Sequence, residues 1–120
     1  MKRLRILIVD DEPNILDVTS RRLQREGHET TTVIDAEWGV ALSRASRFDA
    51  ILMDIDLPGM SGLQAIKQFA SSSKAPIILM TAHSDPKLTQ QALTQGAKAL
   101  LFKPLDLNNL KELLAGLPRP

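Results

Sequence analysis

Four short apolar runs, each ending in a charged or hydroxyl-bearing residue, constrain the fold of this chain more than any other feature. The runs read ILIVDD, AILMD, PIILMT and ALLFKP, at residues 6–11, 50–54, 76–81 and 99–104. Apolar runs of this length are typical of strands buried on both faces of a parallel sheet. All strand C-termini of such a sheet lie along one edge, where ligands bind. The polar ends of the runs are therefore predicted to converge there: Asp10, Asp11, Asp54, Thr81 and Lys103.

Segments with helical periodicity separate these runs, and a weaker strand is predicted at residues 29–33. Strands alternating with helices indicate a parallel sheet covered on both faces. We predict an α/β fold: a single doubly wound, five-stranded parallel sheet with five helices, in the flavodoxin-like order 2-1-3-4-5.

The helix boundaries are predicted from capping residues and from glycines. The first helix is expected over residues 13–26, with Ile15, Val18 or Thr19, and Leu23 facing inward. Asp35, Asp85 and Asp106 are expected to cap later helices, and Gly62 to begin the third. Residues 71–74 are expected to form the loop that leaves the third helix. The inward positions of the later helices are expected to be Val40, Leu42, Leu63, Ile66, Phe69, Leu88, Ala92, Leu107, Leu110 and Leu113 or Leu114.

Length and composition narrow the class of protein. With 120 residues and 43% apolar content, the chain can bury one core but is too short for two. The net charge is +1, and the 15 basic residues are spread out, so direct nucleic-acid binding is not expected. Cysteine is absent. The apolar run before Asp10 is too short for a signal peptide or a membrane span, and we expect a cytoplasmic protein with no membrane contact.

The predicted edge cluster has a specific chemical character. Three carboxylates, one hydroxyl and one ammonium suit a hard divalent cation together with a phosphoryl group. Each residue also has a purely structural interpretation: a strand end, a helix cap, a turn hydroxyl or a surface Lys-Pro pair. Those interpretations would require four independent coincidences at one edge of the sheet. A nucleotide-binding or hydrolytic α/β domain is the alternative, but VDDEPN stands where a glycine-rich phosphate loop would follow the first strand.

From residue 4 to residue 114 the chain resembles the receiver domains of two-component response regulators, the chemotaxis regulators among them. The motifs are the Asp10-Asp11 pair, ILMDIDLPGMSG at residues 51–62, Thr81-Ala82 and Lys103-Pro104. The resemblance implies that Asp54 accepts a phosphoryl group from a histidine kinase or a histidine phosphotransfer protein. It also implies Mg²⁺ as the cofactor, with Mn²⁺ as an alternative.

The resemblance assigns further roles residue by residue. Asp11 and Asp54 would bind the metal through their carboxylates, Asp56 through its backbone carbonyl, and Asp10 through water. Thr81 and Lys103 would contact phosphoryl oxygens, since a short hydroxyl and a compact ammonium suit them. The remaining assignments are Ala82 keeping the entrance open, Asp56 and His83 modulating hydrolysis, and a cis peptide bond between Lys103 and Pro104.

The output side departs from the family pattern. Receivers usually carry Tyr or Phe three positions before the lysine, and this chain has Leu100 there. We expect phosphorylation to switch a face formed by the fourth helix, the fifth strand and the fifth helix, with Leu100 at the switch position. A pseudo-receiver that is not phosphorylated is the alternative, but it would usually lack the acceptor or the acidic pair.

The expected organisation is a receiver domain over residues 1–116, with residues 117–120 as a tail or the start of a linker. Output could pass to a C-terminal domain beyond Pro120 or to a partner protein, and phosphorylation could produce a homodimer. The sequence leaves these alternatives open, as it does the cognate kinase and the lifetime of the acylphosphate.

Overall fold

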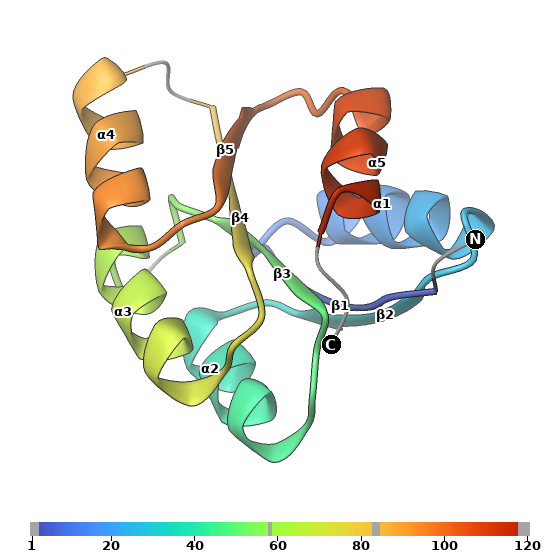
Figure 1. The fold of residues 1–120 in the computed structure, drawn as a ribbon, viewed down its shortest axis with the longest axis horizontal. Helices are drawn as coiled ribbons and strands as arrows, with labels where there is room; N and C mark the ends of the chain where they lie inside the picture. The colour runs from blue at the N-terminus through green and yellow to red at the C-terminus, as the bar shows by residue number, and fades with distance from the viewer. Residues whose placement is uncertain (1–2, 58, 83–84, 118–120) are drawn as a thin grey trace.

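The chain forms a central five-stranded parallel sheet with helices on both faces (Figure 1). The computed structural model describes residues 3–57, 59–82 and 85–117. The elements alternate along the chain as β1 (Arg5–Val9), α1 (Pro13–Arg25), β2 (Glu29–Val33), α2 (Ala36–Ala45), β3 (Ala50–Asp54), α3 (Gly62–Ser72), β4 (Ile77–Thr81), α4 (Pro86–Gln95), β5 (Ala99–Phe102) and α5 (Leu107–Ala115). The strand order is β2-β1-β3-β4-β5, so the predicted α/β class and topology are confirmed.

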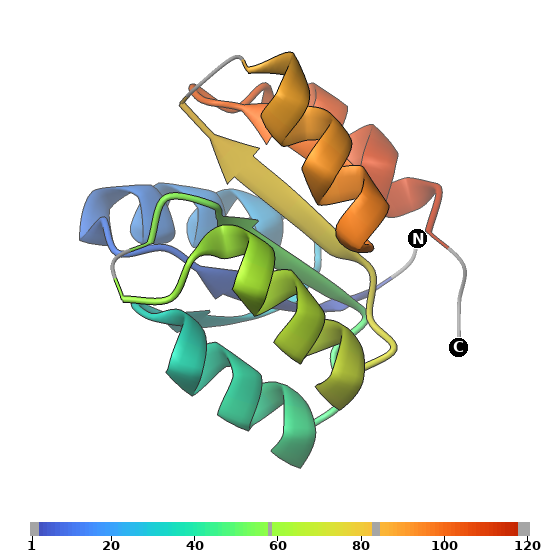
Figure 2. The same ribbon diagram turned by 90° about the vertical axis from the view of Figure 1, so that its left-hand side faces the viewer.

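The sheet is packed on both faces because its inner strands are apolar on both sides. Every residue of β3 and β4 is buried. One face carries α2, α3 and α4, with Val40, Phe69 and Ala92 in the core. The other face carries α1 and α5, with Leu23, Leu110 and Leu114 in the core. Figure 2 shows α2, α3 and α4 on the face turned toward the viewer.

The predicted helix caps are confirmed. The Asp35 carboxylate accepts the Trp38 N–H, that of Asp85 accepts the Lys87 N–H, and that of Asp106 accepts two N–H groups. Each carboxylate satisfies donors that have no partner within the helix. Ser61, which the sequence analysis did not single out, caps α3 by accepting the Gln64 N–H.

Two local predictions need correction. On α1 the buried positions include Leu16 and Thr19, whereas Val18 is 61% exposed. Of the two alternatives Val18 and Thr19, Thr19 is therefore the inward residue. Leu16 and Ser20 are buried positions that were not predicted, and the Ser20 hydroxyl bonds to that of Thr30 at 2.7 Å. Helix α3 continues to Ser72, so the predicted loop at 71–74 begins later than expected.

Within the described residues, no helix combines the length and the apolar character needed to cross a membrane.

Candidate functional site

Asp10 and Asp54 lie at the C-terminal ends of neighbouring strands, β1 and β3. Both are almost fully buried, with 0% and 4% of their surface exposed. Each carboxylate is fixed by a backbone donor two residues ahead. The Glu12 N–H donates to Oδ1 of Asp10 and the Asp56 N–H to Oδ1 of Asp54, both at 2.9 Å. These bonds hold the carboxylates at the edge of the sheet.

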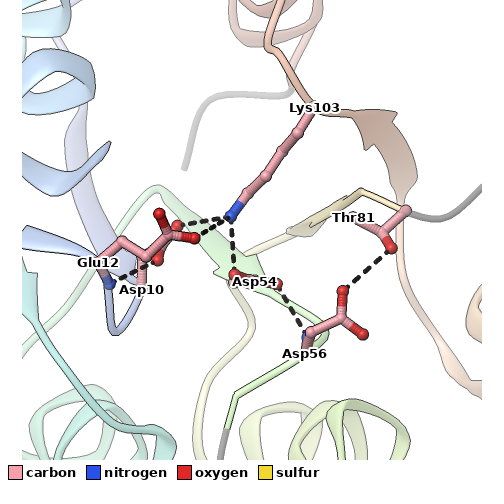
Figure 3. A network of polar contacts seen from close by, with 6 residues as sticks. All are labelled: Asp10, Glu12, Asp54, Asp56, Thr81 and Lys103. Atoms are coloured by element: carbon pink, nitrogen blue, oxygen red, sulfur yellow. Dashed lines mark hydrogen bonds and ion pairs between the residues drawn. The ribbon is translucent and has the colours of Figure 1, made fainter. Parts of the chain in front are cut away.

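Lys103 follows β5 and reaches back over the sheet edge to both carboxylates (Figure 3). Its Nζ lies 2.7 Å from Oδ2 of Asp54 and 3.1 Å from Oδ2 of Asp10. The chain is anchored there because the Lys103 N–H donates to the Thr81 carbonyl at 2.7 Å. The Lys103–Pro104 peptide bond is cis.

Two opposing effects act on the pKa of Lys103. Burial disfavours the ammonium and lowers the pKa, but the hydrogen bonds and negative charges of Asp54 and Asp10 outweigh it. The pKa of Lys103 is therefore raised above its ordinary value, and the side chain stays protonated at neutral pH. A single fixed cation lies between two buried anions.

Four carboxylates gather at this edge, from Asp10, Asp11, Glu12 and Asp54, each offering an oxygen within 4.8 Å of the others. Asp11 and Glu12 are exposed, whereas the other two are buried. Glu12 was not predicted as a site residue, although it directly follows the acidic pair; its Oε1 lies 3.9 Å from Nζ of Lys103. The donor set consists of hard oxygen atoms, which are the preferred ligands of Mg²⁺. The residues therefore fit a hard divalent cation.

Thr81 and Asp56 lie beside this cluster. Thr81, the last residue of β4, is fully buried, and its hydroxyl donates to Oδ2 of Asp56 at 3.4 Å. Figure 3 shows this pair on the side of Asp54 away from Asp10. The Lys103 ammonium thus contacts the Asp54 carboxylate directly, whereas the Thr81 hydroxyl contacts Asp56 beside it.

The chain between Asp54 and α3 makes a close turn that depends on glycine. Gly59 has a φ of 91°, a conformation that residues with a Cβ rarely adopt. At Gly62 a Cβ would lie 2.6 Å from the carbonyl oxygen of Ile55 and 2.8 Å from its Cα. The absence of a side chain lets the start of α3 pack directly against the residue that follows Asp54.

The other predicted positions lie as follows. Ala82 is exposed beside the site, and Leu100 on β5 is half-buried, packed against the core on the α2–α4 face of the sheet. His83 lies outside the described residues. The structure therefore brings Asp10, Asp11, Asp54, Thr81 and Lys103 together as predicted from the strand ends, and adds Glu12.

Comparisons with known proteins agree with this geometry. The family model for the response regulator receiver domain matches residues 6–115, so the chain belongs to that family. Protein PilH of Pseudomonas aeruginosa is 36% identical over 119 residues, which cover 93% of this chain and 98% of that protein. The two-component response regulator ARR10 of Arabidopsis thaliana is 32% identical, but the match spans only 20% of its length.

Among solved structures, the receiver domain of sensor histidine kinase PA1611 from Pseudomonas aeruginosa superposes with a TM-score of 0.83 at 30% identity. The match covers 94% of this chain and 95% of that domain, whose structure holds a magnesium ion in its active-site cleft.

Proposed function

We propose that this receiver domain is a phosphoacceptor in which Asp54 forms an acylphosphate in a metal-dependent reaction. The observation that carries the proposal is the placement of Lys103 between Asp54 and Asp10, inside a group of four carboxylates. A carboxylate that attacks a phosphoryl group repels its negatively charged oxygens, so positive charge must be fixed at the point of attack. Lys103 supplies one such charge 2.7 Å from the Asp54 carboxylate.

The proposed donor is a phosphohistidine of a histidine kinase or a histidine phosphotransfer protein. An Asp54 carboxylate oxygen attacks phosphorus, an O–P bond forms and the P–N bond breaks, and the histidine leaves as neutral imidazole after gaining a proton. Lys103 is placed to move from the carboxylate to a phosphoryl oxygen, and the Thr81 hydroxyl to donate to a second. Turning toward the phosphoryl group would require Thr81 to give up its contact with Asp56.

The metal proposed for this site is Mg²⁺, with Mn²⁺ as an alternative. Asp11 and Asp54 would hold it through their carboxylates, the Asp56 backbone through its carbonyl, and Asp10 through water. When bound, the cation supplies charge that offsets repulsion between nucleophile and phosphoryl oxygens. The carboxylates of Asp11 and Asp54 already offer oxygens within 4.8 Å of each other, and oxygen atoms are the ligands that Mg²⁺ prefers. The magnesium-bound relative supports the assignment.

Hydrolysis returns the domain to its starting state. We propose that Asp56 and His83 modulate this hydrolysis and that Ala82 leaves the entrance open to water.

We propose that the signal passes to the face formed by α4, β5 and α5, where Leu100 occupies the switch position. The signal would act on a C-terminal output domain or on a separate partner protein. A phosphorylation-dependent homodimer is one form that the output could take. We infer a cytoplasmic location because histidine kinases phosphorylate their receivers there.

The central test is phosphate incorporation from a small acyl phosphate, followed by intact-protein mass. Wild-type protein with Mg²⁺ should gain one phosphoryl group, and Asp54→Ala or added chelator should abolish the gain. Asp17→Ala, which removes an exposed aspartate on α1, is the matched control and should incorporate phosphate normally. Incorporation that persists in Asp54→Ala would exclude Asp54 as the acceptor.

A further inference from the structure

A concave site lies at the opposite edge of the sheet from the acidic cluster. It is a cleft of about 600 Å³ between the connection from α2 to β3 and the connection from α3 to β4. Figure 2 shows α2 and α3 side by side, both ending at this edge. The volume falls in the range of about 300–1,000 Å³ that is typical of small-molecule sites.

The charged residues of this cleft are predominantly basic. Arg44, Arg47 and Lys74 line it together with a single carboxylate, that of Asp49. Three basic side chains and one acidic side chain give the lining a formal charge of +2, against +1 for the whole chain. The cations come from both walls: Arg44 lies in the last turn of α2, and Lys74 follows the end of α3.

The one carboxylate does not neutralise these cations. Oδ2 of Asp49 accepts the Arg5 N–H at 2.8 Å, and Oδ1 lies 3.7 Å from Nη2 of Arg47. In the part of the chain that the structure describes, Arg44 and Lys74 have no ion-pair partner. Both side chains are exposed and free to turn toward a bound anion.

The ends of α2 and α3 would by themselves disfavour an anion, because helix C-termini carry partial negative charge. Side chains counter this locally. The hydroxyls of Ser43 and Ser72 lie 2.6 Å apart, so one donates to the other. The second donates to the carbonyl oxygen of its own helix end, which is Val40 at 2.8 Å or Phe69 at 3.2 Å. Arg44 adds a full positive charge in the last turn of α2. The larger part of the lining surface is apolar, and Ala45, Phe48, Ala75 and Pro76 belong to it.

We propose that this cleft binds a small organic phosphate, with the phosphate between Arg44 and Lys74 and an apolar ring against Ala75 and Pro76. Cations on two facing walls suit a compact multivalent anion. A nucleic-acid backbone would need a longer basic stripe. The inference goes beyond the proposed phosphorylation and does not depend on it.

The test is an amide NMR titration of the full chain with AMP, in chelator so that no metal can bridge phosphate to the acidic edge. AMP should shift amides of residues 44–49 and 72–76. The double variant Arg44→Ala/Lys74→Ala should weaken binding by at least about tenfold, since charge-assisted hydrogen bonds are lost. The matched control Arg21→Ala/Lys87→Ala removes two exposed cations from other helices and should bind AMP as wild type does.

Adenosine and inorganic phosphate serve as the two separated halves of the probe, and each should bind more weakly than AMP. Equal binding of adenosine and AMP would show that the cations are not used and would overturn the proposal. The absence of shifts at these residues up to about 10 mM AMP would also overturn the proposal, because that concentration exceeds the millimolar dissociation constant of a weak complex. The proposal would likewise be overturned if an aspartate-rich peptide shifted these amides and AMP did not.

Discussion

Lys103 and Asp54 lie 49 residues apart in the chain and are joined by an ion pair of 2.7 Å in which both side chains are largely withdrawn from solvent. Lys103 contacts Asp10 from the same ammonium at 3.1 Å. A single side chain thus ties the end of β5 to the ends of β1 and β3. Its removal would leave two buried carboxylates without a cation.

Lys103→Met should therefore lower the free energy of unfolding by about 3 kcal/mol, because breaking a buried ion pair leaves uncompensated charge. Lys111→Met is the control, since its ion pair with Glu26 is more exposed and should contribute less than about 1 kcal/mol. Urea unfolding measures both. Equal losses in the two variants would contradict the structural importance of Lys103.

The neighbours Asp10 and Asp11 should respond to neutralisation with opposite signs. Asp10 is buried and paired with Lys103, so Asp10→Asn should destabilise the metal-free protein by about 2 kcal/mol. Asp11 is exposed and adds to the negative charge of the cluster, so Asp11→Asn should be neutral or stabilising by up to about 1 kcal/mol.

Thermal unfolding in chelator measures these changes, and adding Mg²⁺ provides a second test. At about a hundred times its dissociation constant, Mg²⁺ should stabilise the wild type by roughly 2.7 kcal/mol. Asp11→Asn should lose most of this gain. A full Mg²⁺ response in Asp11→Asn would remove that carboxylate from the proposed ligand set.

Gly62→Ala should destabilise the fold by about 2 kcal/mol, because the new methyl group would overlap the backbone of Ile55. Gly116→Ala is the matched control: its φ is −85° and the nearest atom to a Cβ is 3.6 Å away. That substitution should be neutral or slightly stabilising. The two melting temperatures compare the effects directly, and a tolerated Gly62→Ala would mean that the start of α3 can move away from β3.

Stability should also depend on pH through His28. Its Nδ1 accepts the Leu4 N–H at 3.1 Å, which requires the neutral ring. Burial lowers the pKa of His28 below 6.5, against the opposing effect of Glu26. The folded state therefore binds fewer protons than the unfolded state between the two pKa values. The stability that neutral His28 contributes to the folded state is fully present above pH 6.5, and it is lost as the pH falls through the folded pKa.

The check is urea unfolding from pH 5 to 8 for the wild type and for His28→Asn, whose amide oxygen can accept the same N–H. The variant should show a flatter pH dependence of stability in the interval just below 6.5. Parallel curves would mean that His28 does not contribute.

Acylphosphate lifetime should increase in Asp56→Asn, by up to about tenfold if the carboxylate orients the attacking water as a general base. The amide keeps an acceptor for the Thr81 hydroxyl and leaves the backbone bond to Asp54 intact. Loss of phosphate is followed by intact mass after the donor is removed. An unchanged decay would show that the Asp56 carboxylate does not act on that water.

The sequence was sufficient for the features that local chemistry determines. Apolar runs located β1, β3, β4 and β5, and aspartate caps located the starts of α2, α4 and α5. Convergence of Asp54 and Lys103 followed from the parallel topology, because parallel strands share one C-terminal edge. The features that the sequence did not predict depend on tertiary contacts.

The buried face of α1 was partly missed, because Ser20 is polar and apolar periodicity does not detect an inward-facing hydroxyl. Glu12 joins the acidic cluster through side-chain reach, which residue type alone does not reveal. The cationic cleft depends on two connections that are separated in sequence and meet only where α2 packs beside α3.

All four strand pairings in the described part of the chain are parallel, so none of them is a hairpin that could form early from neighbouring residues. The pairing of Ile6 with Ala50 closes a loop that contains α1, β2 and α2, and this loop must close for Asp10 to meet Asp54. Such loop closures are entropically costly and make folding slow relative to helical bundles. We expect the acidic site to assemble late along the folding route, so that a bound cation would mainly retard unfolding and leave the folding rate unchanged.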